Sequence, residues 1–169
     1  GESGESPTPV DTAPAPACRA GDLLLTHVVD GASLGGKRYS VIAATNASTA
    51  DCAIGGWPQV SVVDDAGRVL DVPVVLVDED GREPSPDAAQ AAPVSWLLPP
   101  GARVTSTLHW SIDQSQTETR FLQVRLDGRD VRVLDAPDDP SLTDGDTVRP
   151  LKIPEGSPLR VEPWTAKRH

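Results

Sequence analysis

Three histidines are the side chains of this sequence best suited to acid–base chemistry near neutral pH. They are His27, His109 and His169, and no short spacing joins any of them to the partners that a catalytic or metal site requires. One hypothesis is a hydrolase in which His109 pairs with a carboxylate and activates a serine on a neighbouring strand. The simpler alternative is that His109 is a solvent-facing or hydrogen-bonded histidine in a strand.

Two acidic loops, at residues 78–81 and 138–146, are rich in the oxygen ligands that calcium prefers. Neither loop has the alternating acidic positions and distant Glu of an EF-hand, and Asp-Gly pairs are common in ordinary turns. The sequence also has no Ser-x-x-Lys motif and no phosphate loop ending in Gly-Lys-Ser or Gly-Lys-Thr. We therefore expect no enzyme, no cofactor and no metal. Calcium is the alternative, with candidate ligands Asp78, Asp80, Asp144 and Asp146.

Aromatic side chains are scarce, with four Trp, one Tyr and one Phe. A carbohydrate-binding face usually requires exposed rings, and Trp57, Trp96 and Trp164 would supply a surface patch only if they converge. For Trp57 we favour a lid over the core. The sequon Asn46-Ala47-Ser48 has a similarly plain interpretation, in which Asn46 ends a strand and bonds local backbone.

Cys18 and Cys52 are the only cysteines, and an even count without metal-ligand spacing predicts one disulfide. A closed loop of about 35 residues would stabilise the fold by roughly 3–4 kcal/mol. Disulfides persist in oxidising compartments, so we expect an extracytoplasmic protein. Two free thiols in a cytosolic protein are the alternative.

The net charge of −10 disfavours nucleic acid and anionic membranes as partners. The sequence contains no run of 18 apolar residues, so it predicts no membrane-spanning helix. Since the sequence has neither a signal peptide nor any Met, we expect a mature or recombinant form that has lost its targeting segment.

Short apolar runs separated by turn residues, without an amphipathic helix, predict an antiparallel β-sandwich of about eight strands. In the clearest strand, 104–112, even-numbered residues should face the core and odd-numbered residues solvent. Pro73 places the run 69–77 at a sheet edge or a bulge. We expect three parts: a disordered tether at 1–17, one domain at 18–166 and a frayed end at 167–169.

Several phrases together resemble the family of domains of unknown function found in secreted proteins and lipoproteins of actinobacteria. They are Cys18-Arg19 with Leu23, Asn46-Ala47-Ser48, Cys52 with Gly56-Trp57-Pro58, Asp65-Ala66-Gly67, and Leu97-Leu98-Pro99-Pro100-Gly101-Ala102 followed by Leu108 and Trp110. The resemblance implies an immunoglobulin-like sandwich at the cell envelope and brings no catalytic residues.

We therefore expect a non-catalytic binding or structural module, secreted or anchored by a lipidated cysteine upstream of Gly1. Its partner would be an envelope protein or ligand, and we expect a monomer. Besides the hydrolase, one further alternative is an envelope component that forms oligomers through the edge strand at Pro73.

Overall fold

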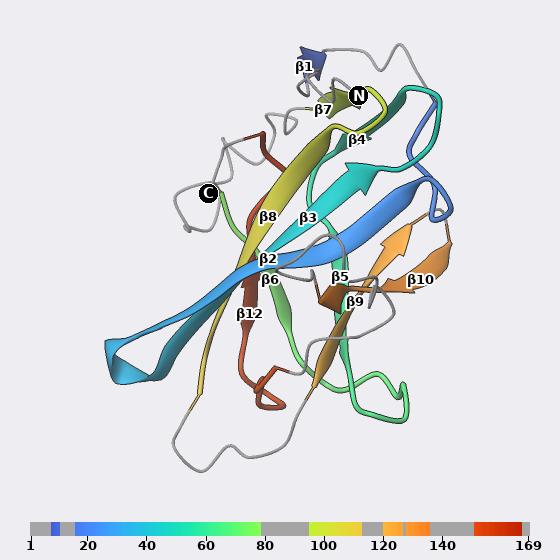
Figure 1. Cartoon of the computed structure of the whole chain (residues 1–169). Coiled ribbons are helices and arrows are strands. Elements are labelled where there is room, and N and C mark those ends of the chain that lie inside the picture. Colours follow the sequence, from blue (N-terminus) through green and yellow to red (C-terminus); the bar gives the residue numbers. More distant parts are fainter. Residues whose placement is uncertain are drawn as a thin grey trace.

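The computed structural model describes residues 8–10, 16–78, 95–112, 120–126, 128–135 and 151–166, with backbone alone at 8–10, 30, 32–34 and 135 (Figure 1). This described part is all-β and contains one disulfide. It has twelve strands instead of the expected eight, because several are only two to four residues long. None of its residues forms a helix long and apolar enough to cross a bilayer.

The described strands form three sheets, with strand orders β11-β2-β3-β8-β12-β6, β1-β7-β4 and β10-β9-β5. Most neighbours are antiparallel, but β11 pairs with β2 and β12 with β6 in parallel. These two pairs depart from the fully antiparallel prediction because each joins segments far apart in sequence, where no tight turn reverses the chain. The strands are β1 Thr8–Val10, β2 Leu23–Ser33, β3 Lys37–Asn46, β4 Cys52–Gly55, β5 Gln59–Val63, β6 Val74–Leu76, β7 Ser95–Leu98, β8 Arg103–Ser111, β9 Phe121–Leu126, β10 Arg129–Arg132, β11 Leu134–Asp135 and β12 Leu159–Val161.

The longest antiparallel pair is the hairpin of β2 and β3, whose tip projects from the body as an arm (Figure 1). The 3-10 turn η1, Leu34–Gly36, closes the hairpin, and Gly35 and Gly36 both have positive φ angles. β8 pairs with β3 along the arm, and the Ile112 amide donates to the Gly36 carbonyl at 2.8 Å. β8 therefore runs beside β3 as far as the turn at the tip of the arm.

One hydrophobic core joins the six-stranded sheet to the β10-β9-β5 sheet. Alternate residues of each strand point into it, as period-two patterns predict. The fully buried members from the two sheets pack in one cluster: Leu25, Ile42, Ala44, Val104, Leu108, Leu159 and Val161 from the first, and Val62, Leu122 and Val124 from the second.

The opposite face of β8 is more buried than expected. Thr105 and Thr107 have exposed fractions of only 3% and 8%, and their cross-strand neighbours Ala43 and Val41 are buried too. The expectation of a solvated face is therefore wrong for this half of the strand. It holds for the other half, where His109 is half-buried and Ser111 is exposed.

Pro73 immediately precedes β6, which forms one edge of the six-stranded sheet, so the prediction of an edge strand is confirmed. A proline there is tolerated because only one side of the strand needs its amides for pairing.

Near the start of the sequence, Thr8–Val10 form β1 against β7, within the range expected to be a disordered tether. Its backbone pairs with β7, and the sequence of residues 1–17 did not predict this pairing because it contains few large apolar side chains.

Candidate functional site

The disulfide between Cys18 and Cys52 is present, with a Cα–Cα distance of 4.9 Å and both residues buried. It joins the segment before β2 to the first residue of β4, as predicted. Hydrogen bonds flank it on both sides, from the Cys18 amide to the Ala53 carbonyl and from the Ala53 amide to the Pro16 carbonyl, each at 2.9 Å. The crosslink therefore holds residues 16–18, the segment that precedes β2, against β4.

Asn46, the last residue of β3, is the centre of a polar network beside the disulfide. Its side chain is 1% exposed, and Nδ2 donates to the carbonyl oxygens of Ala50 and Leu98, each at 2.8 Å. Oδ1 accepts the backbone amide of Ser48 at 2.9 Å and the Ser48 hydroxyl at 2.7 Å. Both hydrogens of the amide are thus used, so the sequon serves a structural purpose in the folded chain.

The backbone of Asn46 completes this junction. Its amide donates to the Ala102 carbonyl at 2.9 Å, and the Gly101 amide donates to its carbonyl at 2.7 Å. Gly101 has a φ of 85°, which favours glycine in the turn after Pro99 and Pro100. The phrases around Cys18, Asn46, Cys52 and Gly101, four of those that suggested a family, therefore meet at one end of the β-body.

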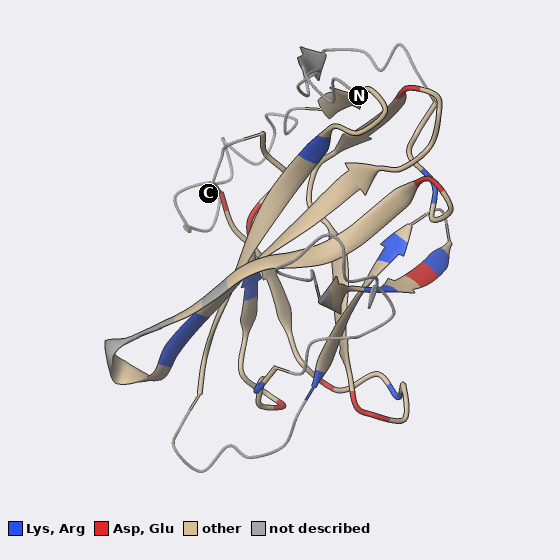
Figure 2. Cartoon of the chain, viewed as in Figure 1, with Lys and Arg blue, Asp and Glu red and all other residues tan. Residues whose placement is uncertain are grey.

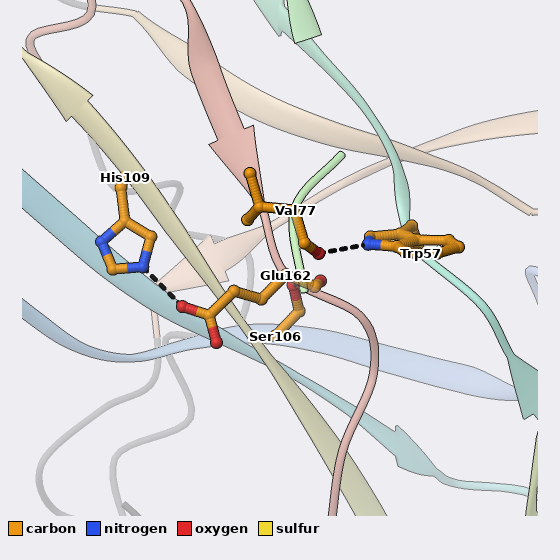
Figure 3. A network of polar contacts seen from close by, with 5 residues as sticks. All are labelled: Trp57, Val77, Ser106, His109 and Glu162. Carbon is orange, nitrogen blue, oxygen red and sulfur yellow. Dashed lines mark hydrogen bonds and ion pairs between the residues drawn. The ribbon is translucent and has the colours of Figure 1, made fainter. Parts of the chain in front are cut away.

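A second polar group of residues lies on the outer face of β8 and β12. Nε2 of His109 and Oε2 of Glu162 are 2.5 Å apart (Figure 3). The His109 side chain is 40% exposed and that of Glu162 is 16% exposed. β8 and β12 place His109 directly opposite Arg160, and β3 places Tyr39 on the other side of His109.

This row borders a surface hollow of about 420 Å³. Its charged members are basic, and Figure 2 shows Lys or Arg positions on β3 and on β12, to either side of β8. The hollow is lined by Lys37, Arg38, Tyr39, His109, Trp110, Ser111, Ser157, Pro158 and Arg160.

A hydrolytic triad requires a hydroxyl within hydrogen-bond reach of the histidine. Ser106 lies on the opposite face of β8, where its Oγ donates to the Glu162 carbonyl at 2.7 Å (Figure 3). Ser111 and Ser157 line the hollow, yet within the described residues no hydrogen bond joins either hydroxyl to His109. The geometry supplies a histidine–carboxylate pair and lacks an aligned nucleophile among these residues.

A match to a known family covers residues 18–165, and that family is described as a domain of unknown function, DUF4232. The chain belongs to this family. Neither the curated proteins nor the solved structures contain a significant match. Membership in DUF4232 confirms the expected unknown-function family, and the junction of Cys18, Asn46, Cys52 and Gly101 lies within the matched range.

In this DUF4232 domain, each of the three tryptophans proposed for a surface patch touches the body. Nε1 of Trp57 donates to the Val77 carbonyl at 2.7 Å, and Nε1 of Trp96 to the Trp164 carbonyl at 3.0 Å. Trp57 and Trp96 are half-buried, whereas Trp164 is 3% exposed. Trp164 therefore cannot belong to an exposed platform, because its ring is taken up by the core.

The remaining candidates divide between described and undescribed residues. His27 is buried, with Nδ1 3.0 Å from the Ser40 hydroxyl. Asp78 is the one calcium candidate that the structure describes, and the described residues contain no group of three potential metal ligands. Asp80, Asp144, Asp146 and His169 lie outside the described residues.

One segment was missed at the level of sequence. Residues 31–35 have the spacing Gly-x-Ser-x-Gly, and residues 31–37 that of a phosphate loop, except that Arg38 replaces its final Ser or Thr. Both motifs require a strand followed by a helix, whereas this segment joins β2 to β3. β3 also separates Ser33 on β2 from His109 on β8, so their strands are about 9–10 Å apart.

Glu162, Tyr39 and Arg160 are functional candidates that sequence patterns did not reveal. Each lies more than 50 residues from His109 in the sequence, and only strand register brings them to it. The available signal was the period-two alternation of β8, which places His109 on the outer face.

Proposed function

We propose that this DUF4232 domain is a non-catalytic binding or structural module that works outside the cytoplasm. The disulfide between Cys18 and Cys52 carries the proposal, because such crosslinks persist in oxidising compartments. A secreted protein and a lipoprotein of an actinobacterial cell envelope both fit it, and the body would be an immunoglobulin-like sandwich. The acidic composition argues against nucleic acid as the partner.

Fractionation of the native host tests the location. Thiol alkylation followed by mass spectrometry of each fraction should find the protein in the envelope or the medium with both cysteines oxidised. A predominantly cytoplasmic protein with alkylated Cys18 and Cys52 would reject the proposal. Metabolic labelling with a fatty acid separates the two extracytoplasmic forms, because only a lipoprotein takes up the label.

A hydrolase is the second candidate, and the contact between His109 and Glu162 favours it. Chromogenic ester and phosphoester substrates test this alternative on the purified protein. Turnover that disappears in His109→Ala but persists in the matched surface variant Arg103→Gln would favour the enzyme. Equal background turnover in all three proteins would favour the non-catalytic module.

Self-association through β6 is a third candidate. Val74 and Leu76 of this edge strand are 39% and 44% exposed, and edge strands offer unpaired backbone groups to another chain. Light scattering over a concentration series distinguishes the expected monomer from an oligomer. If an oligomer forms, Leu76→Pro should disperse it by removing an outward-facing backbone donor, because the odd-numbered residues on either side of it bond to β12.

A further inference from the structure

The hollow over β3, β8 and β12 concentrates positive charge in an acidic protein. Two permanently basic side chains lie on its face, Lys37 and Arg160, whereas the whole chain has a net charge of −10. None of the described lining residues is Asp or Glu. Such a local reversal of sign focuses the field on anions that enter the hollow.

These cations are not consumed by ion pairs with the rest of the described structure. The ion pairs of that part involve Arg120, Arg125 and His109, and no carboxylate lies within 4.0 Å of Lys37, Arg38 or Arg160 there. Among the described residues, Glu162 is the carboxylate that contacts a lining residue of the hollow, and that residue is His109. As far as the described residues go, the basic groups therefore remain available to a ligand.

Strand register fixes where the donors sit. Tyr39, His109 and Arg160 form one row across β3, β8 and β12, and Lys37 lies opposite Ser111 in the adjacent row of the same face. Tyr39 is held over Gly31 of β2, where a β-carbon would collide with the tyrosine ring. The tyrosine ring that borders the hollow can therefore occupy this position only because residue 31 has no side chain.

The charge balance identifies the class of anion. Lys37 and Arg160 contribute two positive charges and the Glu162 carboxylate is engaged by His109, so this face suits a doubly charged anion better than a single carboxylate. The guanidinium of Arg160 can hold two oxygens of a tetrahedral anion at once, and Lys37 adds a point charge. A volume of about 420 Å³ matches that of small-molecule sites.

We propose that this hollow binds the phosphate group of a small soluble phosphomonoester. The assignment goes beyond the proposed function, since it concerns a site that neither the disulfide junction nor the edge strand uses. It also holds whether or not the protein is exported. The proposal rests on the register that places Tyr39, His109 and Arg160 side by side on one face of the sheet.

Titration calorimetry and amide chemical shifts test the proposal, with inorganic phosphate and glycerol 3-phosphate as probes and acetate at equal ionic strength as the comparison. Saturable binding of both phosphates, at least tenfold tighter than acetate, is expected. The shifts should concentrate on β3, β8 and β12. Arg160→Gln and Lys37→Gln should each weaken phosphate binding about tenfold, as expected for loss of a charge-assisted hydrogen bond.

Arg103→Gln is the matched control, because Arg103 is an exposed arginine at the other end of β8. It should leave the affinity within about twofold of the wild type. The proposal is overturned if neither phosphate saturates the folded protein by about 10 mM, or if Arg160→Gln and Lys37→Gln bind as the wild type does. Binding to phosphatidylglycerol vesicles without binding to either soluble phosphate would overturn it as well.

Discussion

The side-chain nitrogen of Asn46 lies 2.8 Å from the carbonyl oxygen of Leu98, a residue 52 positions later in the chain. This bond links the end of β3 to the end of β7, two strands of different sheets. Because both groups are buried, neither can turn to water if the bond is lost. Asn46 therefore connects the sheets beside the disulfide.

Replacing Asn46 by alanine should destabilise the fold by about 2–4 kcal/mol, since the carbonyls of Leu98 and Ala50 would lose their donor. Urea denaturation followed by circular dichroism measures the loss. Thr49→Ala is the matched control at an exposed neighbouring position, and it should stay within about 0.5 kcal/mol of the wild type. A fully stable Asn46→Ala would refute the assigned network.

Replacing Cys18 and Cys52 together by serine should cost about 3–4 kcal/mol, because the unfolded chain would regain the entropy of an open loop. The hydrophobic core lies largely between other residues, so the far-ultraviolet spectrum should keep its strand signal. Urea midpoints with and without reductant provide the measurement. Reductant should lower the midpoint of the wild type to that of the double variant and leave the variant unchanged.

The strands that the sequence predicts well have strong local signals. The run Leu159–Val161 forms β12, and the hairpin of β9 and β10 turns at Gly128, whose φ is 79°. β4 and β11 were missed because they are short and lack alternation, so only their partners make them strands.

The candidate sites follow the same division. The disulfide could be predicted because the sequence offers only one pairing, and Asn46 because it ends a strand before a turn. The contact between His109 and Glu162 could not, since it depends on the register of β12 against β8 across a separation of 53 residues. Local composition contains no information about such a register.

Replacing Trp96 by phenylalanine tests whether this ring is structural or part of a ligand platform. Its Nε1 donates to the Trp164 carbonyl, so the variant should lose about 1–2 kcal/mol while it keeps most of the packing. Chemical denaturation measures the change, and Trp57→Phe should behave alike because its Nε1 donates to Val77. A variant of unchanged stability that loses retention on a polysaccharide column would instead favour the platform.

Replacing Gly36 by alanine should disturb the arm more than the same change at Gly35. Both glycines have positive φ angles, 77° and 81°, so each alanine incurs about 1–2 kcal/mol of left-handed backbone strain. A β-carbon at Gly36 would also collide with the Ile112 carbonyl, whereas at Gly35 it would meet open space. Gly36→Ala must therefore shift the end of β8 as well, and its total cost should exceed that of Gly35→Ala by at least about 1 kcal/mol.

Urea denaturation gives the free energies of unfolding of the two variants. Amide exchange at Ile112 should accelerate in Gly36→Ala alone, since the Ile112 amide donates to the Gly36 carbonyl. Equal losses in the two variants would contradict the close approach of β8 to the turn.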